Sequence, residues 1–109
     1  SPQLERLEEF VILCLNRANK VLGYSKISSG GLSGTVADPK VIFQVALKSN
    51  ASSIILCHNH PSRETKPSDN DIKLTKTLVT AGEFLEINVL DHLIITTDAY
   101  FSFADESLL

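Results

Sequence analysis

The sequence predicts an α/β fold, a curved mixed β-sheet flanked by helices. Short apolar runs rich in β-branched residues alternate with segments of helical spacing, which gives the order β-β-α-β-α-β-β. No segment repeats another at a fixed period, and 109 residues are enough for one core but leave no room for a second domain. The prediction is therefore a single domain over residues 1–109.

The first half of the chain is expected to form a hairpin followed by a helix. Residues 9–16 are typical of a buried strand, and residues 20–27 of its return strand. The glycine-rich stretch 28–35 is interpreted as a loop, because the Lys-Ser/Thr pair of a phosphate-binding loop does not follow it. Asp38 and Pro39 supply an N-cap and a first helical residue for a helix that runs to about residue 49.

The second half is expected to add one strand, one helix and a final pair of strands. The predicted segments are residues 53–57, 68–81, 87–95 and 100–103. Gly82 fits the end of the predicted helix, because glycine is the preferred residue just after a helix C-terminus. The strand 53–57 leads directly into the sequence His58-Asn59-His60-Pro61, where the chemically active residue types gather.

Composition narrows the classes of partner. Ten Lys and Arg against thirteen Asp and Glu give a net charge of −3, which does not favour a basic face for nucleic acid. No run approaches the roughly 18 apolar residues of a membrane span, and the first residues do not resemble a signal peptide. We expect a cytoplasmic protein that does not contact a membrane and for which nucleic acid is a poor candidate partner.

A candidate metal site follows the strand 53–57. His58 and His60 are two residues apart, so in extended chain their rings project from the same face. Asp71, in the first turn of the next predicted helix, supplies a carboxylate as a third ligand. Three protein ligands leave one zinc position open, as in catalytic sites. The alternative is structural, because Ser68 and Asp71 also have the spacing of a helix capping box and the histidines fit an ordinary polar loop.

The same residues resemble a known family. The pattern His58-x-His60-Pro61-x6-Ser68-x2-Asp71 is similar to the full signature of the JAMM (MPN+) metalloproteases. The resemblance is greatest to the bacterial RadC branch, a DNA-repair family, and it extends over residues 7–109. It implies a three-layer arrangement like that of cytidine deaminases, with zinc held by His58, His60 and Asp71.

The resemblance also implies roles in catalysis. A glutamate near the start of the first core strand, Glu9 or its neighbour Glu8 as the alternative, would activate water. Ser68 would stabilise the oxyanion of a tetrahedral intermediate. The implied activity is zinc-dependent cleavage of amide or isopeptide bonds in a peptide or protein substrate. One position departs from the family, whose loop after the histidines commonly reads Ser-Gly, whereas here Arg63 follows Ser62.

Two other functions stay open at this stage. The RadC resemblance also permits a DNA-repair module that acts as a nuclease, which salt-sensitive DNA binding by this domain would support. It further permits a non-catalytic interaction domain, which the absence of peptide turnover would support. His92 is interpreted as a hydrogen-bonded strand histidine, and the other possibilities are that it is an alternative metal ligand or a hydrogen-bond partner of a ligand.

Overall fold

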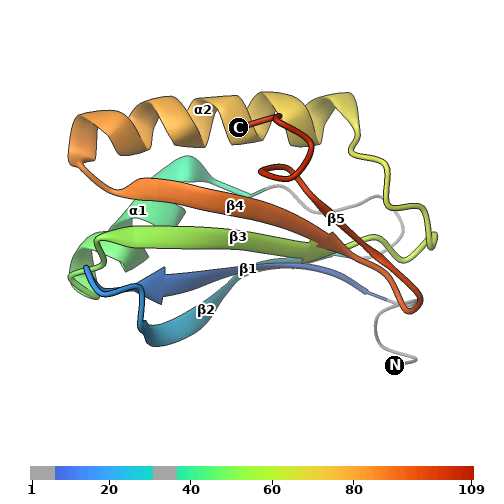
Figure 1. Ribbon diagram of the computed structural model, residues 1–109. Helices are drawn as coiled ribbons and strands as arrows, with labels where there is room; N and C mark the ends of the chain where they lie inside the picture. The colour runs from blue at the N-terminus through green and yellow to red at the C-terminus, as the bar shows by residue number, and fades with distance from the viewer. Residues whose placement is uncertain (1–6, 31–36) are drawn as a thin grey trace.

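The described residues form one five-stranded mixed sheet and two helices, as the sequence predicts (Figure 1). The computed structural model describes residues 7–30 and 37–109. The elements in chain order are β1 (Glu8–Leu15), β2 (Val21–Gly30), α1 (Pro39–Lys48), β3 (Ser53–Asn59), α2 (Asp69–Leu85), β4 (Asn88–Ile95) and β5 (Tyr100–Ser102). The observed order β-β-α-β-α-β-β is the predicted one.

The sheet order β2-β1-β3-β4-β5 places the long hairpin at one edge and the short β5 at the other. β1 is antiparallel to both β2 and β3, and β4 is antiparallel to β5. β3 and β4 are parallel, so the chain must cross over between them, and α2 makes this connection. The C-terminal end of β3 therefore faces the loop that leads into the N-terminus of α2.

Both helices pack on one face of the sheet, which we call the helix-covered face. Its core contains Phe10 and Ile12 of β1, Ile54 and Leu56 of β3, Ile42 and Ala46 of α1, and Leu78 of α2. These strand residues alternate with residues that point the other way. The described residues thus form two layers, a sheet and one layer of helices, and a third layer is not among them.

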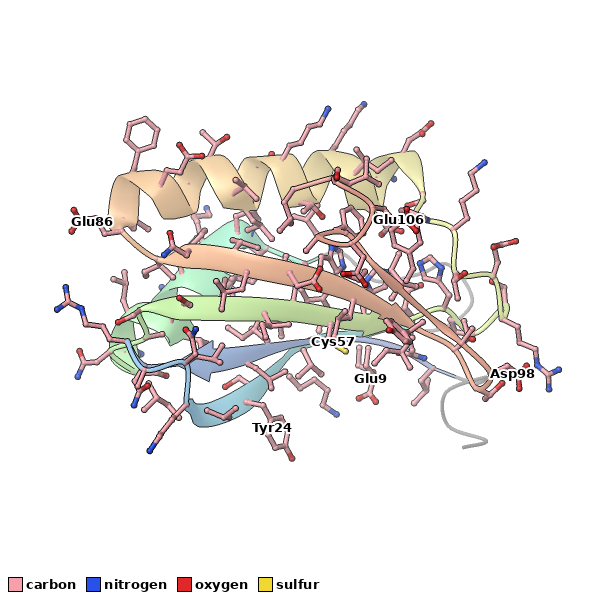
Figure 2. All side chains as sticks on the ribbon, viewed as in Figure 1. Glu9, Tyr24, Cys57, Glu86, Asp98 and Glu106 are labelled. Carbon is pink, nitrogen blue, oxygen red and sulfur yellow. The ribbon has the colours of Figure 1, made fainter. Side chains whose placement is uncertain are left out.

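The opposite side, the open face, carries the alternate residues of the same strands. Glu9, Val11 and Leu13 of β1 and Cys57 of β3 are partly exposed there. Tyr24 of β2 is paired with Leu13 and is 76% exposed. Glu9, Tyr24 and Cys57 lie on the side of the sheet away from α1 (Figure 2).

The end of α2 differs from the prediction. Gly82 is inside the helix, which continues to Leu85 and ends at Glu86 in the left-handed region with φ 56°. Gly82 is buried where the chain returns towards β4, and a side chain there would collide with the carbonyl of Ile87. Its own carbonyl accepts a hydrogen bond from the Ile87 N–H at 2.9 Å. Glycine is therefore used for close backbone approach and not for a helix cap.

The glycine-rich stretch also differs in part. Residues 28–30 belong to β2, and residues 31–36 lie outside the described residues, so the loop prediction is not tested there. Within the described ranges, neither helix is both long enough and apolar enough to span a bilayer.

Candidate metal centre

The candidate site lies where β3 ends and α2 begins. His58 is near the end of β3 on the helix-covered face, with 3% of its surface exposed. Its ring stacks on Phe10 of β1, with ring centroids 5.5 Å apart, because Phe10 and His58 are directly paired between the strands. His60 follows two residues later and brings its ring to within 4.7 Å of the His58 ring, centroid to centroid.

The start of α2 brings the carboxylate to the same place. Ser68 is the N-cap, and its hydroxyl accepts a hydrogen bond from the Asp71 N–H at 3.0 Å. Asp71 Oδ2 accepts one from the Ser68 N–H at 2.8 Å, which completes a capping box. The capping box that the sequence predicts is therefore present, and it also directs the Asp71 side chain at the histidines.

Acceptor atoms from three side chains converge in this cluster. His58 Nε2 lies 2.9 Å from His60 Nε2 and 3.4 Å from Asp71 Oδ1. His60 Nε2 lies 3.2 Å from Asp71 Oδ2. One potential ligand atom from each of the three residues lies within 4.8 Å of those of the other two. Tetrahedral zinc with bonds of about 2.0–2.1 Å separates its ligands by roughly 3.3 Å, which these distances approach.

The other ring nitrogen of each histidine is bound elsewhere. His60 Nδ1 donates to the Glu64 carbonyl at 2.7 Å, and His58 Nδ1 contacts His92 Nε2 at 2.8 Å. A carbonyl can only accept, so the neutral His60 ring keeps the lone pair of Nε2 for the cluster. Two imidazole nitrogens and a carboxylate match the ligand types that zinc prefers. The residues present therefore fit a metal ion.

The electrostatics of the cluster favour a cation. Burial opposes ionisation of Asp71, but hydrogen bonds with His58, His60 and the Ser68 N–H outweigh it and hold the pKa of this carboxyl well below its usual range. The hydrogen bond with Asp71 raises the pKa of His60, against the effect of burial. The Glu64 carbonyl and the charges of Asp71 and Glu8 act on His60 in the same direction.

The structure does not bring Glu9 to the cluster. Glu9 points to the open face, where its carboxylate forms an ion pair with Lys26 at 3.0 Å. Successive residues of a strand point to opposite faces, so Glu8 shares the helix-covered face with Phe10 and His58. The charge of Glu8 acts on His60, which places Glu8 near the cluster. The carboxylate that lies near the cluster is therefore that of Glu8, the alternative expected from the sequence, and not that of Glu9.

Asn59 fixes the backbone on both sides of Glu8. Its side-chain N–H donates to the Leu7 carbonyl at 2.6 Å, and its Oδ1 accepts from the Glu9 N–H at 2.8 Å. Asn59 is buried and lies between the two histidines in sequence, pointing away from them. One amide therefore ties the start of β1 to the end of β3 on both sides of Glu8.

Comparison with known proteins shows the family of the chain. The RadC-like JAB domain family matches residues 2–108, which is nearly the whole chain. The chain belongs to the RadC-like JAB domain family. A UPF0758 protein of Flavobacterium johnsoniae is 48% identical over 101 residues, which are 93% of this chain and 44% of that protein. The UPF0758 protein of Porphyromonas gingivalis is 48% identical over 103 residues, 94% of this chain and 45% of its own length.

A third relative is less similar to the chain. The UPF0758 protein Mbar_A2303 of Methanosarcina barkeri is 38% identical over 105 residues, 96% of this chain and 46% of that protein. This JAB domain therefore spans less than half the length of the curated relatives it matches.

In the loop of this JAB domain between the histidines and α2, Arg63 occupies the position where the related family commonly has glycine. Arg63 has φ 70°, in the left-handed region that favours glycine, and its N–H donates to the His60 carbonyl at 3.2 Å. The position where the resemblance gives glycine thus keeps a glycine-like conformation. The Arg63 guanidinium lies 3.9 Å from the Asp98 carboxylate, and both side chains are largely exposed.

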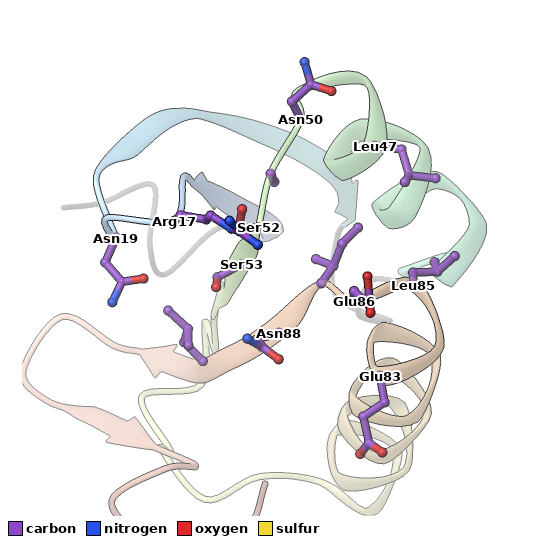
Figure 3. Close-up of a pocket in the computed structure, with 13 residues that line it drawn as sticks. Arg17, Asn19, Leu47, Asn50, Ser52, Ser53, Glu83, Leu85, Glu86 and Asn88 are labelled. Atoms are coloured by element: carbon purple, nitrogen blue, oxygen red, sulfur yellow. The ribbon is translucent and has the colours of Figure 1, made fainter.

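A separate pocket lies at the other end of the sheet (Figure 3). Arg17, Ser52, Glu83 and Asn88 are among its lining residues, at the start of β3 and β4 and the end of α2. The His58, His60 and Asp71 cluster lies at the opposite end of β3. The pocket of this JAB domain is therefore distinct from its candidate metal centre.

The buried His92 gives this JAB domain a predicted pH dependence. Burial, and secondarily the charge of His58, lower the pKa of His92 to about 3. In the unfolded chain the same imidazole takes up a proton near pH 6.5. The stability that depends on a neutral His92 is therefore fully present above this pH and is lost as the pH falls towards 3.

The expected slope is about 1.4 kcal/mol of unfolding free energy per pH unit between roughly pH 6 and pH 4. Chemical denaturation of zinc-free wild type and of His92→Gln at several pH values measures it. Glutamine does not titrate, so the unfolding free energy of the variant should fall less steeply with decreasing pH. The expected difference between the two slopes is the contribution of His92. Equal slopes in the two proteins would contradict the assignment.

Proposed function

We propose that the domain is a zinc-dependent hydrolase of amide or isopeptide bonds, a metallopeptidase of JAMM type, with a peptide or protein as substrate. The observation that carries the proposal is the convergence of two imidazole nitrogens and a carboxylate, with Glu8 on the same face of the sheet. Such a donor set with three protein ligands is typical of catalytic zinc. Cys14 and Cys57 are free, which agrees with the proposed cytoplasmic location.

His58, His60 and Asp71 would hold the zinc ion. When bound, zinc supplies Lewis-acid chemistry, because it polarises a carbonyl and lowers the pKa of water. The chain contributes the orientation of the ligands. Phe10 stacks on one ligand ring, the Glu64 carbonyl holds the other, and the capping box fixes the carboxylate. Little rearrangement is therefore needed before an ion binds.

Glu8 is the proposed general base, in place of the Glu9 expected from the sequence. Its carboxylate would take a proton from the attacking water and later pass it to the leaving amine. Asn59 supports this role, since it holds the backbone on both sides of Glu8. Glu9 is engaged with Lys26 on the other face of the sheet.

Ser68 is the proposed donor to the oxyanion that develops on the scissile carbonyl. Its hydroxyl oxygen accepts the Asp71 N–H, so the hydroxyl hydrogen can point towards substrate. Ser68 is exposed at the start of α2, next to the cluster in the capping box. The same residue can therefore cap the helix and donate a hydrogen bond.

Hydrolysis of a mixed peptide library by the zinc-loaded domain tests the proposal. We expect new amino termini to appear with zinc present, to disappear after chelation, and to return when zinc is restored. A magnesium-loaded sample is the control, because Mg²⁺ prefers oxygen ligands in octahedral geometry and this site offers nitrogen. Cleavage that persists in the chelated sample, or no cleavage with zinc bound, would contradict the proposed activity.

A further inference from the structure

A buried chain of hydrogen bonds connects His58 back to the helix that carries Asp71. His58 Nδ1 lies 2.8 Å from His92 Nε2, and His92 Nδ1 lies 2.7 Å from the Thr75 hydroxyl. The Thr75 hydroxyl also contacts the backbone carbonyl of Asp71 at 2.7 Å. His92 of β4 and Thr75 of α2 are both 0% exposed. This chain of hydrogen bonds therefore connects β3, β4 and α2 through buried side chains.

The backbone carbonyl of Asp71, at the end of this chain of hydrogen bonds, determines which atom donates in each bond. A carbonyl only accepts, so the Thr75 hydroxyl must donate to Asp71. The Thr75 oxygen then accepts from His92 Nδ1–H. A second proton on His92 would bury a full charge at 0% exposure, which is costly, so its Nε2 is an acceptor.

The last member of the chain of hydrogen bonds is the ring of His58, one of the proposed zinc ligands. Because His92 Nε2 accepts, His58 must carry its proton on Nδ1, and its Nε2 keeps a lone pair directed at His60 and Asp71. A neutral imidazole in water favours the opposite tautomer, with the proton on Nε2, which would block the atom that faces the cluster. The tautomer required for metal binding is thus specified before an ion arrives.

Aromatic packing holds the His92 ring in place. Phe103 stacks on it, with centroids 4.5 Å apart and planes inclined by 11°. Phe10 meets it edge-on at 5.6 Å and also stacks on His58. The Phe103 N–H donates to the His92 carbonyl at 3.0 Å. The orientation of His92 is therefore fixed by contacts that do not depend on His58.

We propose that His92, anchored by Thr75, is a positioning residue that fixes the tautomer and ring orientation of His58 for metal binding. The inference rests on the proposed zinc site and deepens it, because it assigns a role to a buried histidine that is not itself a ligand. Outer hydrogen-bond partners of this kind typically change metal affinity 10- to 100-fold. The closed path from the Asp71 backbone to His58 also couples the position of α2 to the ligand on β3.

Two measurements on wild type, His92→Leu, His92→Gln and Thr75→Val test the proposal. The first is the ¹⁵N spectrum of the His58 ring in the zinc-free protein at mildly alkaline pH, which reports the nitrogen that carries the proton. The second is zinc affinity by competition with a chelator. Leucine removes the acceptor, whereas the glutamine oxygen can still accept from His58 Nδ1. Thr75→Val removes the anchor and leaves His92 in place.

We expect the proton on Nδ1 in wild type and His92→Gln, and a shift towards Nε2 in His92→Leu. Zinc binding should weaken about 10- to 100-fold in His92→Leu, recover in His92→Gln, and weaken to a smaller extent in Thr75→Val. A wild-type His58 protonated on Nε2, or equal zinc affinity in His92→Leu and wild type, would overturn the proposal. Equal weakening in the Leu and Gln variants would also overturn it, because only packing would then matter.

The two readouts separate this inference from the proposed function. The ring spectrum needs no metal, so it decides the tautomer even if wild type fails to bind zinc. If His92→Leu does not fold without zinc, Thr75→Val decides, because wild-type zinc affinity in that variant overturns the proposal and a loss supports it.

Discussion

Replacing Asp71 with asparagine removes tight zinc binding, because the amide carries no charge and is a poor zinc ligand. Its oxygen can still accept from the Ser68 N–H, so the capping box largely survives and the helix keeps its start. The loss should exceed the roughly 10- to 100-fold effect of removing an outer hydrogen-bond partner. Competition against a chelator of known affinity measures it.

Asp69→Asn is the matched control for this experiment. Asp69 lies in the same first turn of α2 and is exposed, but it does not belong to the ligand cluster. Its substitution removes the same charge from the helix N-terminus and should leave zinc affinity almost unchanged. Equal losses in the two variants would show that general electrostatics, and not ligation by Asp71, determine binding.

Replacing Glu8 with glutamine should lower turnover by about 10²- to 10⁴-fold, the usual contribution of a general base. The amide cannot accept a proton, whereas the size of the side chain and the pairing of β1 are preserved. Zinc content should stay at the wild-type level, because Glu8 is not one of the three clustered ligands. Steady-state kinetics on a cleaved peptide, with metal analysis of the same samples, measures both quantities.

Glu9→Gln provides the comparison that separates the two adjacent glutamates. It breaks an ion pair with Lys26 whose members are partly exposed, and such pairs contribute little to stability. Turnover should remain within a few fold of wild type. A large loss in Glu9→Gln together with normal turnover in Glu8→Gln would return the role of base to Glu9 and contradict the strand geometry described here.

The cluster of His58, His60 and Asp71 could be predicted from sequence because the spacing of these residues is local. A His-x-His pair on an extended strand must share a face, and the Ser-x-x-Asp spacing of a capping box places both residues at one helix start. The end of β3 lies next to the start of α2 because α2 connects the parallel strands β3 and β4.

The choice between Glu8 and Glu9 could not be made in the same way. Residues of both parities along β1 are apolar, so alternation does not reveal which face is covered by helices. The face is decided by the pairing of Phe10 with His58, a contact between distant parts of the chain. A shift of one residue reverses the direction of the carboxylate.

His92 is the hydrogen-bonded strand histidine expected from the sequence, but its partners could not be predicted. Thr75 and His92 belong to different elements from His58 and meet it only after the sheet and α2 have packed. Asn59 was flanked by the predicted ligands, but its bonds to the start of β1 depend on the antiparallel register. Gly82 was assigned to a helix end, since sequence does not distinguish a cap from a close approach to Ile87.

The zinc K-edge absorption spectrum of the domain loaded with one equivalent of zinc tests whether His58, His60 and Asp71 bind the ion. We expect scattering from two imidazole rings and from oxygen, with bonds of about 2.0–2.2 Å. The spectrum should change in Asp71→Asn and not in Asp69→Asn. A sulfur shell at about 2.3 Å, or zinc that is removed from wild type by gel filtration, would contradict a site built from His58, His60 and Asp71.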